Sequence, residues 1–383
     1  MNNSILSNIS KELALILYIL SYKLSLSSKE ELATFAANEK INWDRFIQLI
    51  RLHRLNTICF LTLNECEIKI PTQELEKIKL NFEKERRRNF IVNSSLIQVN
   101  QVLEENHLQF LWIKGPAQSQ RMYNNPILRS YSDIDLYIDL KDLHKIDSIL
   151  RKLDYYPTEE WKNYPKSHFS KFVEIKKEFS YVHPKKRVSI DLHWNIVLSN
   201  KLLPLTFEDL YQNSITLDFY SSKIKTLSNE ENFIYLNIHG TFDTWKQLSQ
   251  LFDISYSIKE TPSLVNRFDR YLIDNQLSEK LKEGILLSDF LFKKETNYSK
   301  GYNYLTKYEF YSETEESRIQ RFKRISSFHP SIKYKVECFE YLFFYKSINK
   351  RIKLPKALFY LYYLHIPLTF INMIFRKNKK TPQ

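Results

Sequence analysis

The chain has 383 residues, of which 43% are hydrophobic and 26% charged, and its formal net charge is +13. This composition is ordinary for a folded protein and argues against disorder along the whole chain. Only four glycines occur, which argues against folds built on repeated glycine-rich phosphate loops. The positive charge favours an anionic partner such as a nucleotide, a nucleic acid or an acidic membrane; the alternative is a solvated, lysine-rich surface.

Cysteine usage and the N-terminus bear on the compartment. Cys59, Cys66 and Cys338 form no CxxC pair and are too few for a disulfide framework or a cysteine-rich zinc site. A reducing, cytoplasmic setting is therefore expected. The apolar stretch 13–20 lacks a basic leader and a small-residue cleavage site, so it predicts a core-facing helix rather than a signal peptide.

Residues 1–106 are predicted to form an N-terminal helical region. Asn42 is a plausible N-cap for a helix whose apolar residues recur at near-helical spacing, namely Trp43, Phe46, Ile47 and Ile50. Pro71 opens a second, long helix whose apolar period continues from Leu75 to Leu103. The arginine cluster 86–88 on that helix predicts a solvated face, with phosphate contact as the alternative reading.

Residues 107–228 are predicted to form an α/β core. Alternation at 108–112 predicts a strand that ends in a turn at Lys114-Gly115-Pro116, followed by a short helix over 117–123. Residues 133–138 alternate as a second strand. Asp142 is the expected N-cap of a helix with apolar residues from Leu143 onward. A third extended region is predicted over 172–196, with clear alternation at 188–194.

The rest of the chain returns to helical periodicity. Residues 229–350 are predicted to form a C-terminal helical region, and residues 351–383 an apolar terminal helix with basic flanks. The stretch 357–375 contains no Asp, Glu, Lys or Arg. Because Pro367, His365 and several tyrosines interrupt it, a helix docked on the protein is favoured over a membrane-surface helix, and both over a transmembrane helix.

Asp133 and Asp135 are the strongest candidates for chemistry. In a strand, residues i and i+2 project from one face, so both carboxylates point the same way and favour a bound cation. Oxygen ligands suit a hard ion such as Mg²⁺. Asp191, in another alternating segment, would complete a two-metal site. An isolated Asp-x-Asp is more often a solvated strand face; the second apolar-Asp-apolar strand and the Lys114-Gly115 turn favour the metal site.

A family resemblance rests on the order of these motifs. The chain runs from Lys114-Gly115 through Tyr123, Pro126 and Arg129 to Asp133-Ile134-Asp135-Leu136, and then to Ile190-Asp191-Leu192-His193-Trp194. In this it resembles the uncharacterised bacterial nucleotidyltransferase family, related to the polymerase-beta-type nucleotidyltransferases. Trp43, His53, His239 and Trp245 resemble that family's helical flanks. The resemblance implies an α+β fold with a small mixed sheet of nucleotidyltransferase type, flanked by N-terminal and C-terminal helical regions.

The same resemblance implies an activity. A nucleoside monophosphate would pass from a nucleoside triphosphate, with ATP as the expected donor, to an acceptor hydroxyl on a small molecule, a peptide or protein, or RNA. Two Mg²⁺ ions would be held by Asp133, Asp135 and Asp191. The nucleotide-binding group would consist of Lys114, Gly115, Arg129, Ser132 and His193. Replacing Asp133 or Asp135 with Asn is expected to abolish metal-dependent turnover with little loss of folding.

Three alternatives stay open at this point. Pro116 supplies no N–H where a phosphate donor is expected, which favours a catalytically silent nucleotide- or RNA-binding protein with the same fold. The terminal helix favours a peripheral membrane accessory protein. His193 either touches substrate or supports the site from beneath, and His239 is expected to be a core histidine, or with Trp245 and Asp253 to close the site.

Overall fold

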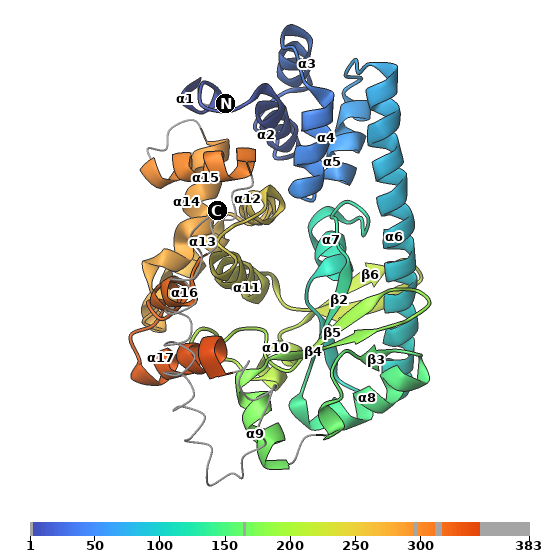
Figure 1. Ribbon diagram of the computed structural model, residues 1–383, viewed down its shortest axis with the longest axis vertical. Coiled ribbons are helices and arrows are strands. Elements are labelled where there is room, and N and C mark those ends of the chain that lie inside the picture. Colours follow the sequence, from blue (N-terminus) through green and yellow to red (C-terminus); the bar gives the residue numbers. More distant parts are fainter. Residues whose placement is uncertain (1–2, 164–165, 294–297, 311–315, 345–383) are drawn as a thin grey trace, which may run out of the picture.

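A computed structural model describes residues 3–163, 166–293, 298–310 and 316–344. Helices precede and follow a small mixed sheet, so the α+β architecture predicted from the sequence is confirmed (Figure 1). The predicted terminal helix 351–383, with its apolar stretch 357–375, lies outside the described residues. Among the helices that are described, none combines the length and the apolar character needed to cross a membrane.

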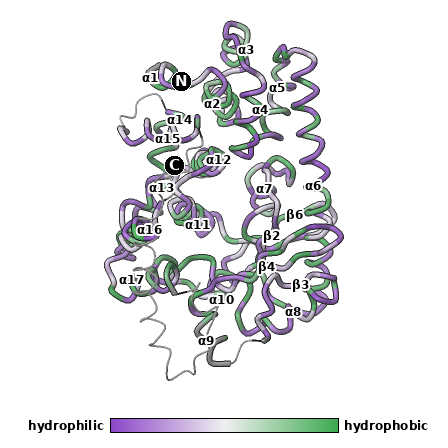
Figure 2. The backbone as a smooth tube through the Cα atoms, in the orientation of Figure 1, coloured by the Kyte–Doolittle hydropathy of each residue, from purple (hydrophilic) through white to green (hydrophobic). Residues whose placement is uncertain are grey.

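Six helices make up the N-terminal region: α1 (Asn3–Leu6), α2 (Lys11–Lys23), α3 (Lys29–Asn38), α4 (Trp43–Leu52), α5 (Asn56–Glu65) and α6 (Thr72–Glu105). The two helix starts predicted in this region are confirmed: the Asn42 side chain accepts the N–H of Arg45 at 3.1 Å, and α6 begins directly after Pro71. The long α6 runs from the N-terminal helices down along the sheet (Figure 1). In Figure 2 α2 is mostly green, in keeping with its many buried residues, whereas α6 is largely purple because most of its residues are not buried.

The main sheet has five strands in the order β1-β2-β5-β4-β3. Its strands are β1 (Phe110–Trp112), β2 (Asp133–Ile138), β3 (Tyr156–Pro157), β4 (Glu178–Val182) and β5 (Ser189–His193). Only β2 and β5 pair in parallel; the other neighbours are antiparallel. The helices within this region are α7 (Gly115–Tyr123), α8 (Leu143–Lys152), α9 (Lys166–Ile175) and α10 (Phe207–Gln212).

Two parts of the central region differ from the sequence prediction. The expected extended region does not begin at Phe172, because α9 continues to Ile175; Phe169, Phe172 and Val173 recur at i, i+3 and i+4, which is helical spacing. A hairpin of β6 (Ile215–Phe219) and β7 (Ser222–Thr226) was not predicted. Its two-residue turn contains neither glycine nor asparagine, and Tyr220 takes a φ of 53° there, so the usual hairpin signal is missing.

The C-terminal region is helical as predicted, within the residues described. Its helices are α11 (Asn229–Phe242), α12 (Leu248–Glu260), α13 (Ser263–Asp274), α14 (Glu283–Phe292), α15 (Ser299–Phe310), α16 (Arg318–Ile325) and α17 (Ile332–Phe339). Ser228 and Glu231 form a capping box at the start of α11, which fixes where that helix begins. Helices α11 and α12 lie opposite the sheet (Figure 1).

Strand alternation divides the main sheet into an apolar face and a polar face. Ile134, Leu136 and Ile138 point into a core shared with α6 and α8. Asp133 and Asp135 must therefore point to the opposite face, since successive side chains alternate. On β5 the same alternation sends Ile190 and Leu192 into the core and Asp191 to the polar face. The hydrophobic pattern thus fixes the direction of the candidate carboxylates.

Buried His53, at the end of α4, joins the N-terminal helices to the C-terminal region. Its Nε2 donates to the Tyr308 carbonyl at 3.0 Å, and its Nδ1 accepts the Leu248 N–H at 3.4 Å. This arrangement uses the neutral imidazole, with one nitrogen protonated and the other accepting. Burial lowers the pKa of His53 from 6.5 to about 4, with the bond to the Tyr308 carbonyl and the charge of Glu309 opposing the shift.

We therefore expect acid to destabilise the fold through His53. Between pH 6.5 and 4 the unfolded chain binds a proton at this position and the folded chain does not, so stability falls as pH falls. The loss should approach about 3 kcal/mol at pH 4. Urea unfolding at pH 7 and pH 4.5 should show a smaller acid-induced loss in His53→Gln than in the wild type. His144→Gln, an exposed control on α8, should keep the wild-type loss. An unchanged loss in His53→Gln would contradict this role.

Candidate active site

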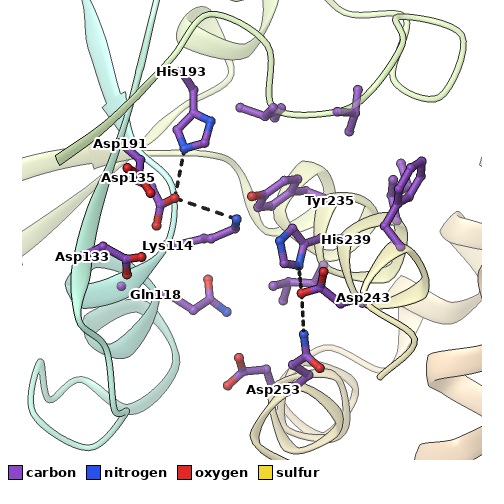
Figure 3. Close-up of a pocket in the computed structure, with 18 of the residues that line it drawn as sticks. Lys114, Gln118, Asp133, Asp135, Asp191, His193, Tyr235, His239, Asp243 and Asp253 are labelled. Carbon is purple, nitrogen blue, oxygen red and sulfur yellow. Dashed lines mark hydrogen bonds and ion pairs between the residues drawn. The ribbon is translucent and has the colours of Figure 1, made fainter. Parts of the chain in front are cut away.

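Three aspartates lie together on the polar face of the sheet. Asp133 and Asp135 come from β2, and Asp191 comes from β5, directly opposite Asp135 in the parallel pair. The pairing of β2 with β5 thus brings together residues that are more than fifty positions apart in the sequence. Figure 3 shows all three carboxylates on the same side of the cavity. The sequence predicted these residues as a group, and the strand pairing brings them side by side.

Asp135 is the centre of a charged network. His193 Nε2 lies 3.0 Å from its Oδ1, and Lys114 Nζ lies 3.8 Å from the same oxygen (Figure 3). The other ring nitrogen of His193, Nδ1, lies 3.0 Å from Oε2 of Glu178 on β4. Both ring nitrogens therefore face carboxylate oxygens, an arrangement that suits the protonated imidazolium. Burial disfavours the charged ring, but these two carboxylates prevail and raise the pKa of His193 to about 9.

The carboxylates differ in their electrostatic environments. Burial, together with the charge of Asp135, raises the pKa of Asp133. Burial also raises the pKa of Asp191 to about 6, against a hydrogen bond from Ser180 and with help from the charges of Asp135 and Glu178. At Asp135 burial has the same tendency, but Lys114 and His193 outweigh it and lower the pKa. In the described residues neither Asp133 nor Asp191 has an ion-pair partner, so both carboxylates can coordinate a cation.

Gly115 shapes the turn beside the carboxylates. Its φ is +50°, and a Cβ on this residue would lie 2.8 Å from the Asp133 carbonyl oxygen. Glycine is thus required both for the conformation and for the close approach to β2. Pro116 falls in the first turn of α7, where its missing N–H leaves no helical bond unmade. The preceding Lys114 points into the cavity, 5.3 Å from the centroid of the Tyr235 ring.

A cavity of about 570 Å³ separates the sheet from α11 and α12. Pockets for small ligands commonly span roughly 300 to 1,000 Å³. The carboxylates and Lys114 form one wall, and residues of the C-terminal region form the wall opposite. That second wall includes Tyr235, Leu236, His239, Asp243, Lys246, Gln250 and Asp253. The site thus depends on packing of the helical region against the sheet.

The remaining predicted nucleotide-binding residues lie in different surroundings. Arg129 lines the cavity, and its Nε donates to Asp253 Oδ2 at 2.9 Å, while Tyr123 donates to Oδ1 of the same carboxylate at 3.0 Å. Ser132 is exposed and is not among the residues that line the cavity. His239 lines the cavity with its Nδ1 3.6 Å from Asp243 Oδ2, so it is not simply a core histidine.

Several residues of the site were not predicted from the sequence. Glu178 begins a five-residue alternating strand, a pattern that puts its carboxylate on the side away from buried Phe179 and Tyr181. Tyr235 and His239 on α11 and Asp243 at its C-cap are spaced by four residues, and this spacing places them on one side of the helix. Neither pattern shows from the sequence alone that β4 or α11 faces the aspartates. That information is tertiary.

The carboxylates of the site are oxygen donors, the kind of ligand that Mg²⁺ prefers. Across the described ranges, no three or more His, Cys, Asp or Glu side chains converge as a ready-made metal site. Mg²⁺, however, commonly uses only one or two carboxylates, together with water and substrate phosphates. Asp133 and Asp191 are oxygen donors without an ion-pair partner in the described part of the chain, and they flank Asp135 on one face. The residues therefore fit Mg²⁺ that arrives with a phosphorylated ligand.

Comparison with known proteins identifies the family. The chain belongs to a family of uncharacterised nucleotidyltransferases, whose model matches residues 39–293. The match includes every predicted site residue. No curated protein matches the sequence. A solved structure of an antigenic nucleotidyltransferase-like protein from Paracoccidioides brasiliensis is similar at 15% identity and a TM-score of 0.29, over 51% of this chain and 91% of that one. This likeness is too remote to assign a function.

Proposed function

We propose that the protein is a Mg²⁺-dependent nucleotidyltransferase that transfers a nucleoside monophosphate from a nucleoside triphosphate, with ATP as the expected donor, to an acceptor hydroxyl. The observation that carries this proposal is the parallel pairing of β2 and β5, which sets Asp191 against Asp135 and beside Asp133. The cavity above them is lined on the same side by Lys114 and Gly115. Membership of the nucleotidyltransferase family supports the reaction class.

The proposed step is a displacement at the α-phosphorus. The acceptor oxygen bonds to the α-phosphorus. The bond from the α-phosphorus to the oxygen that bridges the α- and β-phosphates breaks, and pyrophosphate leaves with the electron pair. The acceptor proton passes to Asp191. Mg²⁺ held by Asp133, Asp135 and Asp191 would supply charge neutralisation at the phosphates.

The protein's own groups position the reactants. Lys114 offers an ammonium to the phosphates, and the backbone at Gly115 permits their close approach. His193, held between Asp135 and Glu178, fixes the orientation of the Asp135 carboxylate. Arg129 supplies a cation whose direction is set by Asp253. Most of the acceleration would come from positioning and electrostatic stabilisation rather than from acid–base catalysis. We propose that the acceptor is a small molecule, a peptide or protein, or RNA. We also propose that residues 351–383 make a peripheral contact with a membrane.

Calorimetric titration with the four ribonucleoside triphosphates, with and without Mg²⁺, tests the proposal. At least one triphosphate should bind the wild type, and Mg²⁺ should strengthen its binding. Asp191→Asn should lose the Mg²⁺-dependent part by tenfold or more, since one anionic ligand is removed. Asp209→Asn, an exposed change outside the cavity, should behave like the wild type. Binding with no response to Mg²⁺ in any of these proteins would contradict the proposal.

One observation favours a second function, that of a catalytically silent nucleotide- or RNA-binding protein. The charge of Asp135 is already compensated by Lys114 and His193, so this carboxylate has cationic partners without a metal. A silent protein would bind the triphosphate yet release no pyrophosphate. Incubation with α-labelled and γ-labelled triphosphate separates the two: transfer leaves the α-label on an acceptor and the γ-label in pyrophosphate, whereas a silent protein leaves both labels in the intact triphosphate.

A further inference from the structure

Arg54 reaches the cavity from the N-terminal region, well outside the α/β core. It follows α4 in a turn closed by two backbone bonds, from Arg54 N–H to the Arg51 carbonyl at 3.2 Å and from Leu55 N–H to the Ile50 carbonyl at 2.7 Å. Buried His53 anchors the same turn to the C-terminal region. The backbone that carries Arg54 is therefore fixed on both sides. The side chain itself lines the cavity together with Lys114 and Asp133.

The guanidinium of Arg54 differs in its contacts from the cationic groups of Lys114 and Arg129. Within the described residues it makes no hydrogen bond and no ion pair, whereas Lys114 and Arg129 face Asp135 and Asp253. Arg54 is exposed, and its positive charge opposes the rise in the pKa of nearby Asp133. A guanidinium presents several N–H donors in a planar fork, which matches the oxygens of a phosphate group. An uncommitted arginine beside the carboxylates thus suits an anionic part of the ligand.

We propose that Arg54 binds the β- and γ-phosphates of the nucleoside triphosphate, so that the N-terminal helical region supplies part of the nucleotide site. This inference rests on the proposed function and names a phosphate-binding residue in it. The β- and γ-phosphates are the part that leaves as pyrophosphate. Arg54 therefore distinguishes a triphosphate from a monophosphate, while Lys114 faces Asp135 at 3.8 Å.

Two substitutions separate this role from a structural one. Arg54→Gln removes the charge, and Arg54→Gly removes the side chain while suiting the φ of 56° at this position. Eleven non-glycine residues in the described chain, Arg54 among them, have a positive φ, so this backbone conformation alone does not mark a binding residue. Arg51→Gln, an exposed arginine of the same turn outside the cavity, is the matched control. Arg54→Lys keeps the charge but not the fork.

Isothermal titration calorimetry in the presence of Mg²⁺ measures two affinities of each variant. One is for the triphosphate that binds the wild type best, and the other is for the corresponding monophosphate. Arg54→Gln and Arg54→Gly should each weaken triphosphate binding at least tenfold, leave monophosphate binding unchanged and unfold no earlier than the wild type. Arg54→Lys should lose less, and Arg51→Gln should lose nothing. Wild-type affinity for the triphosphate in Arg54→Gln, or equal loss for both nucleotides, overturns the role of Arg54 alone. A wild type that binds no triphosphate overturns the proposed function as well.

Discussion

Asp135→Asn should abolish Mg²⁺-dependent turnover and also lower the free energy of unfolding by about 3 kcal/mol. Asp135 is 6% exposed and faces both His193 and Lys114. Its neutralisation therefore leaves Lys114 without this carboxylate and His193 with Glu178 alone, at a largely buried site. The structure thus changes the expectation from sequence, which was a loss of turnover at little cost to folding. Urea unfolding and pyrophosphate release, measured on the same preparations, provide the two readouts.

Asp133→Asn is the matched comparison. Asp133 is partly exposed and has no ion-pair partner among the described residues, so its replacement should abolish turnover and leave stability within about 0.5 kcal/mol of the wild type. Wild-type stability in Asp135→Asn would show that the network around His193 contributes little. Retained turnover in both variants would remove these residues from the site.

The second large effect should come from Gly284→Ala or Gly240→Ala. Trp245 is 1% exposed, and its ring lies between α11 and α14 in contact with both glycines. A Cβ added at either glycine would overlap atoms of the indole ring. Because the ring is enclosed on both sides, it cannot move away from the added methyl group. Each substitution should lower the free energy of unfolding by about 3 kcal/mol, the upper part of the range for an overpacked core. Thermal or urea unfolding measures the loss.

A double-mutant cycle identifies the cause. Trp245→Leu removes the ring that a Cβ at Gly284 would meet, so Gly284→Ala should cost much less in the Trp245→Leu background than in the wild type. Additive losses would mean that the cost arises from the helix α14 backbone or another neighbour. Trp245 also lines the cavity, so Gly240→Ala and Gly284→Ala should weaken nucleotide binding as well as lower the free energy of unfolding.

The carboxylate strands could be predicted because local patterns specify them. Alternation places Asp133 and Asp135 on one face of a strand, and the apolar residues between them decide which face is buried. The flanking helices follow from apolar spacing and caps such as Asn42. Asp191 could be proposed for the same site from its own alternating strand and from the family resemblance, but the pairing of β5 with β2 cannot be read from the sequence.

The rest of the site depends on packing between distant segments. Glu178 contributes because β4 pairs with β5, and Tyr235 contributes because α11 lies across the cavity from the sheet. Arg54 is more extreme: its turn is oriented by contacts of His53 with Tyr308 and Leu248, which are about two hundred or more residues away. Periodicity describes one element at a time and therefore cannot reveal such neighbours.

The metal site at the three aspartates can be tested by a titration of Mn²⁺, followed by electron paramagnetic resonance, in the presence of the nucleoside triphosphate that binds best. Mn²⁺ shares the oxygen-ligand preference of Mg²⁺. We expect the wild type to immobilise two Mn²⁺ ions with the nucleotide and Asp133→Asn, with its fold intact, to immobilise fewer. Equal immobilisation of Mn²⁺ by the wild type and by Asp133→Asn would contradict a metal site at these carboxylates.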